Sequence, residues 1–580
     1  MLRTALLGLI VFATAAAADD SAVSPRELAA EEAQSMLRVL DDSDRARYRR
    51  IFELQEDARW GEADALIGEL EDEVLKGYVE FQRYMHPTGY RASYDELKRW
   101  LAYYADHPNA DEIHALAKKR RPKGAVPPLA PEARKWRGPA EGFELHPLLR
   151  ADYAKTGESR LQRVEGRVRH LCKKDLASQA LKEIDKHLAR GEITERQYDR
   201  MRSWIAASYY FQGYVDGAGR IAEEVARRNG DVAVLSRWIA GLIAFRNGEM
   251  EAAKTHFVAM AAVPYQEDNL RSAAGFWAAR AALAAGSAES VTPNLEIAAA
   301  YPFTFYGQLA LSQLGREYPW RWAPPPLNTA ALGQLYEDAP AVKRAVALAE
   351  TGEDLEADLE LRWANGRISD AQRKDLLAVA AALDLPAAQI DIALAGGKEL
   401  EAGLFPIPDY APSGGFKADR ALLYALMRQE SKFKVEATSR VGARGLMQLM
   451  PRTASYMAKD RSLRGKGKNR LYDPSYNLEL GQSYVNHLIS TASGGDLFAM
   501  AVAYNGGPGN LRRWKREADI DDPLLFIESI PNSESRDFVE KVLTNFWIYR
   551  ARLGQTPIER DLVAAGKLPL YEALDNVAAE

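Results

Sequence analysis

The chain has 580 residues, of which 47% are hydrophobic and 27% charged, and its formal net charge is −5 at pH 7. Single hydrophobic cores stop growing at about 250–300 residues, so this length predicts several domains or one extended repeat architecture. A near-neutral balance on this length excludes wholesale nucleic-acid binding. The single cysteine, Cys172, rules out an intramolecular disulfide, and the eight histidines are scattered without metal-ligand spacing, so we expect no metal site.

Residues 1–18 have the pattern of a secretory signal peptide. Arg3 supplies a positive start, Leu6 to Ala13 form a short apolar run, and Ala16 to Ala18 offer small residues for cleavage. The run is shorter than the roughly 20 residues that cross a bilayer, although a retained membrane anchor is the alternative. No cysteine follows the cleavage region, which argues against a lipid-modified N-terminus. We therefore expect an exported, soluble protein that is at most peripheral to a membrane.

From residue 24 to residue 400 the pattern is helical almost throughout, with apolar residues three and four positions apart and abundant alanine. Short turns such as Asn247-Gly248 separate helices of roughly 10–15 residues, which indicates stacked helix pairs. One helix pair can be identified around Asn247-Gly248, with Trp238 and Gly241 before the turn and Phe257 after it. This pair resembles a tetratricopeptide-type hairpin. No strict period exists, so an irregular helical array is equally compatible with the pattern.

Two proline-rich segments interrupt the helical pattern, because a helix does not continue through them. The first extends from Pro319 to Leu327, and the second, from Gly403 to Gly415, marks the predicted start of the last domain. The residues from about 556 to 580 are either a tail or a packing arm.

Residues 419 to 431 predict one amphipathic helix that carries a carboxylic acid on its apolar face. Leu423, Met427 and Glu430 are four and three residues apart, so they share this face. Glu430 also lies in the last turn, where the helix dipole is negative, and both burial and the dipole raise the pKa of a carboxyl group. A protonated carboxylic acid is what general-acid cleavage of a glycosidic bond requires. A solvated terminal glutamate is the structural alternative.

Two glycine-bearing segments follow at distances that allow them to fold back around Glu430. The first is Gly445-Leu446-Met447-Gln448, whose amide group suits the N-acetyl and hydroxyl substituents of a sugar. The second, Tyr504-Asn505 followed by Gly506 to Gly509, ends a helix predicted from Leu497. Between them, Asp473-Pro474 predicts an N-cap and first residue of a helix to about Ile489. Each glycine segment alone is compatible with a plain interhelical turn.

In this order and spacing, Glu430-Ser431, Gly445 to Gln448 and Ala503-Tyr504-Asn505 resemble the soluble lytic transglycosylase family. Segments at Tyr84 to Thr88, Tyr104 to Pro108 and Tyr301 to Ala310 extend the resemblance over most of the chain.

The resemblance implies a mostly α fold, in which an N-terminal superhelix that is ring-like in the family precedes a catalytic domain similar to goose-type lysozyme. The predicted division follows: signal peptide 1–18, superhelical domain 19–290, helical linker domain 291–405, catalytic domain 406–555 and C-terminal segment 556–580. The implied substrate is peptidoglycan, cut between N-acetylmuramic acid and N-acetylglucosamine with a 1,6-anhydro end as product.

The resemblance implies, position by position, that Glu430 is first the catalytic acid and then the base. It makes the following residues line the glycan groove: Ser431, Gly445, Leu446, Met447, Gln448, Tyr504 and Asn505. Phe538 departs from the family, which often has a tyrosine there with its hydroxyl near the acid. Phenylalanine keeps the packing and loses that hydrogen bond.

The mechanism depends on whether a second acid reaches Glu430. Ordinary glycosidases use two carboxylates, whereas the nearest acid in sequence here is Glu436, beyond the predicted helix end. A single acid requires the acetamido group and 6-hydroxyl of the substrate to complete the reaction. A hydrolytic muramidase on the same scaffold is the alternative if another acid arrives from elsewhere in the fold. A non-catalytic scaffold that binds glycan and wall-synthesis proteins is a third interpretation.

A cation-rich segment, from Lys459 to Arg470, contains six cations and one acid, Asp460. It is either an attachment surface for the acidic peptide stems of the wall or a solvated loop, which is the more common role of such runs. No organic cofactor is implied. The expected partners are glycan strands of peptidoglycan and, through the helical domain, wall-synthesis proteins, and the expected location is the periplasm.

Overall fold

The computed structural model describes residues 36–133 and 146–575, so the predicted signal peptide at residues 1–18 lies outside the described residues. Within these ranges the regular structure is helical, and extended pairing is limited to three isolated bridges. The predicted mostly α fold class is confirmed. No described helix combines the length and the apolar character that a membrane crossing needs.

The described residues form two compact units, each built from two separate stretches of the chain. One unit contains residues 36–133 and 325–385, and the other contains residues 146–324 and 386–575. The chain therefore leaves the first unit, builds part of the second, and returns before it completes the second. The predicted domain boundaries after residues 290 and 405 stay predictions.

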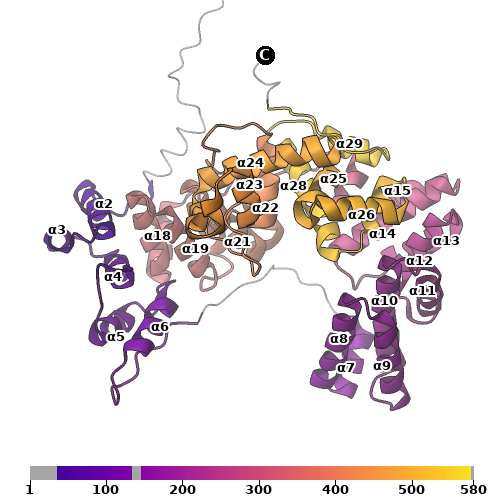
Figure 1. Cartoon of the computed structure of the whole chain (residues 1–580), viewed down its shortest axis with the longest axis horizontal. Helices are drawn as coiled ribbons and strands as arrows, with labels where there is room; N and C mark the ends of the chain where they lie inside the picture. The colour runs from indigo at the N-terminus through magenta and orange to yellow at the C-terminus, as the bar shows by residue number, and fades with distance from the viewer. Residues whose placement is uncertain (1–35, 134–145, 576–580) are drawn as a thin grey trace, which may run out of the picture. The chain divides into compact units, whose positions relative to one another are not determined.

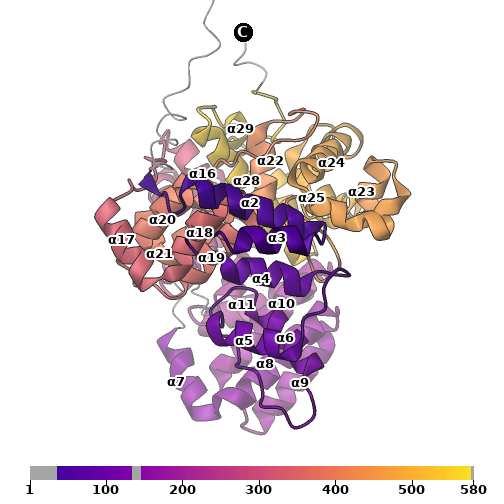
Figure 2. The same ribbon diagram turned by 90° about the vertical axis from the view of Figure 1, so that its left-hand side faces the viewer.

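The first unit is a set of short helices that pack on one another in succession, as the indigo helices α2, α3 and α4 do in Figures 1 and 2. Trp100 lies fully buried at its centre and donates to the carbonyl of Gly77. The helices of this unit are α2 (Asp42–Glu56), α3 (Trp60–Ile67), α4 (Lys76–Met85), α5 (Tyr94–Tyr103), α6 (Ala110–Arg120), α17 (Thr329–Asp338), α18 (Pro340–Thr351), α19 (Asp354–Asn365) and α20 (Arg373–Ala382).

The second unit begins with helix pairs that stack in chain order. Its first helices are α7 (Pro147–Thr156), α8 (Glu158–Lys173), α9 (Ala177–Ala189), α10 (Glu195–Phe211), α11 (Val215–Asn229), α12 (Val234–Arg246), α13 (Met250–Ala261), α14 (Asp268–Ala284), η1 (Ala288–Ser290), α15 (Val291–Ala299) and α16 (Phe305–Gln313). The predicted hairpin around Asn247-Gly248 is formed by α12 and α13. A Cβ at Gly241 would lie 2.6 Å from the Phe257 ring, so only glycine allows this approach.

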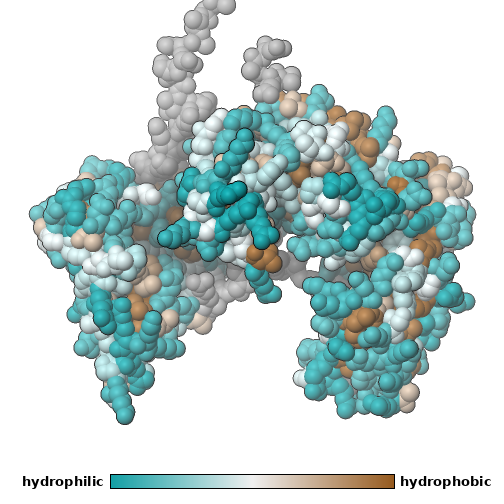
Figure 3. Space-filling model, in the orientation of Figure 1, coloured by the Kyte–Doolittle hydropathy of each residue, from teal (hydrophilic) through white to brown (hydrophobic). Residues whose placement is uncertain are grey.

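The remaining helices of the second unit include α22 and α28, which pack along each other. They are α21 (Pro386–Gly396), η2 (Gly397–Leu404), α22 (Arg420–Glu430), α23 (Pro451–Met457), η3 (Arg461–Arg464), η4 (Lys466–Tyr472), α24 (Pro474–Leu488), η5 (Ile489–Ser493), α25 (Leu497–Gly506), α26 (Pro508–Ala518), α27 (Pro523–Glu528), α28 (Ser533–Arg552) and α29 (Ile558–Ala564). The core helix α25 is apolar almost all round, whereas α26 buries only Leu511 and Trp514 and presents a hydrophilic face in Figure 3.

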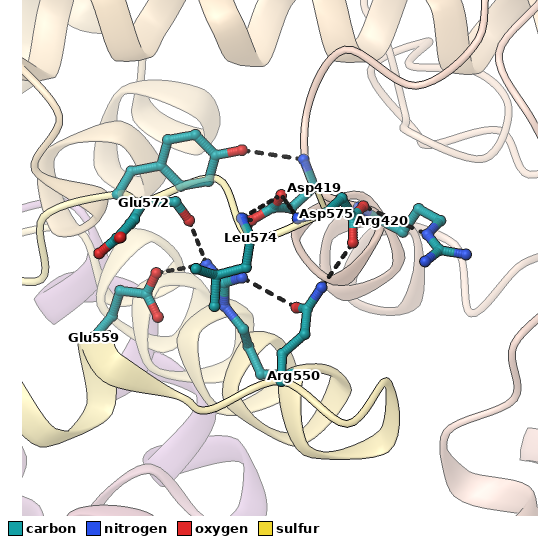
Figure 4. Close-up of polar contacts among 9 residues, drawn as sticks. Asp419, Arg420, Arg550, Glu559, Glu572, Leu574 and Asp575 are labelled. Atoms are coloured by element: carbon teal, nitrogen blue, oxygen red, sulfur yellow. Dashed lines mark hydrogen bonds and ion pairs between the residues drawn. The ribbon is translucent and has the colours of Figure 1, made fainter. Parts of the chain in front are cut away.

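Residues 556–575 are a packing arm rather than a free tail. After α29, the arm pairs with the start of α25, because the Leu497 amide donates to the Pro569 carbonyl at 3.0 Å and the Tyr571 amide donates to the Gly495 carbonyl at 2.8 Å. It then reaches the start of α22, where the amides of Leu574 and Asp575 donate to the Asp419 carboxylate at 3.0 and 3.1 Å (Figure 4).

Arg550 from α28 completes this contact beneath the arm (Figure 4). Its guanidinium is fully buried and pairs with Asp419 at 3.0 Å and with Glu559 at 2.6 Å. It also donates to the Glu572 carbonyl at 2.6 Å. We call the arm residues 569–575 with Asp419 and Arg550 the C-terminal clasp. The clasp holds the N-termini of α22 and α25, whose opposite ends carry the predicted site.

Candidate active site

Helix α22 has the limits that the sequence predicts, with Asp419 as its N-cap residue and Ser431 as its C-cap residue. Its apolar stripe is fully buried, including Leu423 and Met427. Arg428 anchors the last turn, because its guanidinium donates to the Leu404 carbonyl at 2.7 Å and to Asn545 Oδ1 at 2.8 Å. The position of Glu430 is therefore set by a helix that is held at both ends.

Glu430 is half-buried at the end of this helix. Among residues 36–133 and 146–575, no group forms a hydrogen bond or ion pair with its carboxylate. Burial, with a smaller contribution from the negative charge of Glu534, raises the pKa of Glu430 to about 8. The side chain is therefore a carboxylic acid at neutral pH, in agreement with the expectation from its face and its place at the helix C-terminus.

The chain turns sharply directly after this acid. Lys432 and Phe433 both adopt left-handed backbone conformations, with φ of 50° and 60°. Such conformations cost non-glycine residues of order 1–3 kcal/mol each and persist where the surrounding structure enforces them. The fully buried Phe433 ring supplies that enforcement, and the Ser431 hydroxyl is satisfied by its own helix through the Met427 carbonyl at 3.1 Å. Ser431 is thus buried and bonded.

The segment Gly445 to Gln448 is organised by Asn477 in α24, a residue that sequence reasoning missed. The Asn477 side chain is fully buried, accepts from the Met447 amide at 2.8 Å and donates to the carbonyls of Arg444 and Leu471 at 3.0 and 2.7 Å. A Cβ at Gly445 would lie 2.2 Å from the Leu471 carbonyl oxygen, so glycine is required. Only the spacing after Asp473-Pro474 places this asparagine in the helix, and nothing local indicates its partners.

Gln448 has a different role from the one expected of a free amide. Its side-chain NH2 donates to the carbonyls of Ala437 and Gly445 at 2.9 and 2.8 Å, and its backbone φ is 45°. Both amide protons are therefore used within the loop, and only the carbonyl oxygen remains for a ligand. Leu446 and Met447 are 0% exposed, so their side chains belong to the core behind this loop.

Tyr504 joins the helix α25 to this loop and lies within electrostatic range of Glu430. Its hydroxyl donates to the Met447 carbonyl at 2.8 Å. Burial, together with the negative charge of Glu430, raises the pKa of Tyr504. Asn505, the next residue, is half-buried and accepts from the Ser535 hydroxyl at 2.7 Å through Oδ1. Within the described residues its Nδ2 has no partner, which leaves this amide available to a ligand.

Helix α28 is the fourth segment of the site, after α22, the loop Gly445 to Gln448 and α25. Phe538 stacks on Tyr504 with ring centroids 6.0 Å apart and planes 9° apart, and its side chain is buried. Glu534, one turn earlier, is exposed and near enough for its charge to act on Glu430. It is the second acid that sequence reasoning did not find, because it lies 104 positions from Glu430 and only the α22–α28 packing brings it close.

The structure thus brings Glu430, Gln448, Tyr504, Asn505 and Phe538 together from four separate segments. The other predicted residues are buried: the side chains of Ser431, Leu446 and Met447, and the backbone of Gly445. Their role as ligands of a glycan stays a prediction. In the described part of the chain, no three His, Cys, Asp or Glu residues gather as a metal would require. The arrangement offers one protonated acid beside amide and aromatic groups.

Comparison with known proteins agrees with this site. The family model "Transglycosylase SLT domain" matches residues 412–526. The soluble lytic murein transglycosylase of Escherichia coli K12 is 37% identical over 147 residues, which are 25% of this chain and 23% of that protein. Its counterpart in Salmonella typhimurium is 41% identical over 133 residues, 23% of this chain and 20% of that protein. The aligned segments thus span about a quarter of these relatives.

Similarity in fold extends much further along the chain. The crystal structure of the 70 kDa soluble lytic transglycosylase of Escherichia coli superposes with a TM-score of 0.56 over 89% of this chain and 98% of that one, at 20% identity. The complex of a 70 kDa soluble lytic transglycosylase with bulgecin A gives a TM-score of 0.57 over the same shares and at the same identity. At this identity the similarity establishes the fold, which confirms the predicted helical superhelix followed by a lysozyme-like domain. The match to the transglycosylase SLT domain family itself covers residues 412–526.

Proposed function

We propose that this protein is a peptidoglycan lytic transglycosylase that cleaves the β-1,4 bond between N-acetylmuramic acid and N-acetylglucosamine. The observation that carries the proposal is the half-buried carboxyl group of Glu430, whose raised pKa of about 8 keeps it protonated at neutral pH. The match of residues 412–526, which include Glu430, to the transglycosylase SLT domain supports the choice of substrate, as do the related soluble lytic murein transglycosylases.

In the proposed reaction, Glu430 first donates its proton to the glycosidic oxygen, and the bond to C1 of the muramyl sugar breaks. The acetamido oxygen of that sugar stabilises the oxocarbenium-like centre. The Glu430 carboxylate then removes the proton from the 6-hydroxyl as this oxygen attacks C1. The product is a 1,6-anhydro-muramyl end, and Glu430 regains its proton. Gln448 Oε1 and Asn505 Nδ2 are the polar groups that would orient the N-acetyl and hydroxyl substituents.

The nearby Glu534 favours one second candidate, a hydrolytic muramidase. Glycosidases that use water employ two carboxylates, and here Glu534 is an exposed carboxylate within electrostatic range of Glu430. In that reaction Glu534 would activate a water molecule, and the product would be a reducing end. The lyase is preferred because, in the part of the chain that the structure describes, neither a hydrogen bond nor an ion pair connects Glu534 to any site residue.

Mass spectrometry of the products separates the two reactions. Purified sacculi are digested in H₂¹⁸O: the lyase yields anhydro-muropeptides without label, and the hydrolase yields products that are one water heavier and carry ¹⁸O. We expect unlabelled anhydro ends from the wild type and from Glu534→Gln. Labelled reducing ends from the wild type, with loss of activity in Glu534→Gln, would instead establish the muramidase.

The proposed setting follows from this substrate. A periplasmic location agrees with the predicted signal peptide at residues 1–18, and the glycan strand is the proposed partner. Wall-synthesis proteins bound through the helical domain are a further proposal. A non-catalytic glycan scaffold is the interpretation to adopt if Glu430→Gln and the wild type both release no muropeptide from sacculi to which they bind.

A further inference from the structure

A strongly basic surface of the second unit is built by residues 452–470, which we call the basic segment. The segment includes α23, η3 and most of η4 and has a single acid, Asp460, in a chain whose net charge is −5. Its seven cations are Arg452, Lys459, Arg461, Arg464, Lys466, Lys468 and Arg470. The surface over α23 is strongly hydrophilic in Figure 3.

Most of this charge has no internal partner. Arg470 pairs with Asp460 at 2.9 Å, and Arg464 donates to the Ser455 hydroxyl at 3.0 Å. The other five cations are exposed and form no ion pair with any residue in 36–133 or 146–575. Cations grouped without counter-charges raise the local potential and attract anions.

The basic segment is folded and ordered by its own contacts. Leu463 and Leu471 are both 0% exposed and fasten its two short helices to the core. The Arg470 guanidinium lies 4.6 Å from the centre of the Tyr476 ring in α24. The cations are therefore presented on a fixed surface, unlike those of a solvated loop, and binding an anion would not require the segment to be ordered first.

The same segment is continuous with the candidate active site. It starts directly after the loop that contains Gln448, and it ends two residues before Tyr472. The Tyr472 hydroxyl forms a 2.6 Å hydrogen bond with the hydroxyl of Thr438, which precedes that loop. Asn477 ties both regions together, because its amide binds the Leu471 carbonyl and the Met447 amide. A polymer in the site would thus pass close to the basic segment.

We infer that the basic segment docks the carboxylate groups of the peptide stems carried by the glycan strand. This inference rests on the proposed function. The sugars of the strand are uncharged, because each lactyl carboxyl group is amide-linked to its stem, so they give five unpaired cations nothing to bind. The peptide stems carry several carboxylates each and repeat along the strand. Contact with many exposed charges is weak per pair, additive over a polymer and sensitive to salt.

The test uses a fourfold neutral variant, Lys459→Gln, Arg461→Gln, Lys466→Gln and Lys468→Gln, none of which is in the site. A matched control neutralises four exposed, unpaired cations outside the segment: Lys374→Gln, Lys398→Gln, Arg516→Gln and Lys567→Gln. Each protein is assayed on intact sacculi, on sacculi with chemically amidated carboxyl groups, and on glycan strands that are freed of peptide by an amidase and then amidated at the exposed lactyl carboxyl groups.

We expect the fourfold variant to have a KM about tenfold higher on intact sacculi at low salt, with kcat unchanged. On amidated sacculi and on peptide-free strands it should equal the wild type, and added NaCl should remove the difference. The control should match the wild type on all three substrates. An equal loss on all three substrates, no loss on intact sacculi, or an equal loss in the control would each overturn the inference.

Binding without cleavage separates this inference from the proposed function. Glu430→Gln protein, with and without the fourfold change, is co-sedimented with intact and amidated sacculi. We expect about tenfold weaker binding of the fourfold change to intact sacculi only. If the wild type fails to cleave intact sacculi while this binding difference is found, the proposed function fails and the docking surface stands. Equal binding of both proteins overturns the docking surface alone.

Discussion

The two ends of helix α22 present two acids in opposite situations. At the N-terminus, Asp419 is 1% exposed and its carboxylate binds Arg550 and the backbone amides of Leu574 and Asp575. At the C-terminus, Glu430 is half-buried, and no described residue binds its carboxylate. The same helix therefore holds one carboxyl group that is bound by three donors and one that no described residue binds.

The difference shows how placement assigns a role to a carboxyl group. Three donors bind the Asp419 carboxyl group, whereas burial and the negative end of the helix dipole favour the neutral form of Glu430. An acid that is bound by three donors joins elements of the fold. A neutral acid with free oxygens is able to transfer a proton. Four predictions test this contrast, from the largest expected effect to the smallest.

Replacing Glu430 should abolish cleavage of the glycan and leave the fold intact. Glu430→Gln keeps the size of the side chain and removes the proton that the first step uses, so we expect muropeptide release to fall by about 10³-fold. Release from sacculi is measured by chromatography, and circular dichroism serves as the control for folding. Retention of more than a tenth of the wild-type rate would contradict the role of this acid.

Removing the cation that binds Asp419 should instead lower the free energy of unfolding. Arg550→Met leaves the carboxylates of Asp419 and Glu559 buried without their cation, so we expect a loss of about 3–5 kcal/mol in the free energy of unfolding. Urea denaturation followed by circular dichroism measures it. Lys541→Met, in an exposed pair on the same helix, is the control and should change stability by less than about 0.5 kcal/mol. A loss no larger than that of the control would show that the clasp is not needed.

The pH dependence should follow the proton of Glu430. Since the reactive form is the acid, kcat/KM should fall as pH rises through about 8 and decline about tenfold per unit above it. The pKa of Glu430 is about 8 in the folded protein and near 4.5 in the unfolded chain, so between these pH values only the folded protein holds the proton. The contribution of this group to stability is therefore largest below about pH 4.5 and is lost progressively as the pH rises to about 8. Thermal unfolding of the wild type and Glu430→Gln from pH 5 to 9 should show this slope only in the wild type. A flat rate profile from pH 6 to 10 would refute the raised pKa.

The smallest effect is expected at Phe538. Phe538→Tyr adds a hydroxyl beside the ring of Tyr504 in a buried position, where it is useful only if it reaches the Glu430 carboxyl. We expect kcat to change by less than about tenfold and stability by about 1 kcal/mol or less. Steady-state rates and thermal unfolding measure both. A large increase in kcat would mean that the acid lacks an orienting bond in the natural chain.

Local features of the fold were largely predictable. The limits of α22, the Asp473 cap of α24 and the glycine contact between α12 and α13 follow from periodicity, capping and small-residue rules that act within about 15 residues. The direction of side chains in the loops was not predictable. Gln448 turns its amide back on its own loop because Ala437 and Gly445 present carbonyls there, which no local pattern reveals.

The sequence by itself determined that this protein is helical, that Glu430 ends an amphipathic helix and that two glycine-bearing segments accompany it. These properties depend on the order of neighbouring residues, which is what backbone propensity and hydrophobic period respond to. Only the tertiary structure decided that Glu534 lies near this acid, that Leu446 and Met447 are buried, and that residues 569–575 hold α22 and α25 from behind. The reason is physical: burial, charge and hydrogen bonding of a side chain are set by whatever packs around it, and here those neighbours come from positions 30 to 155 residues away.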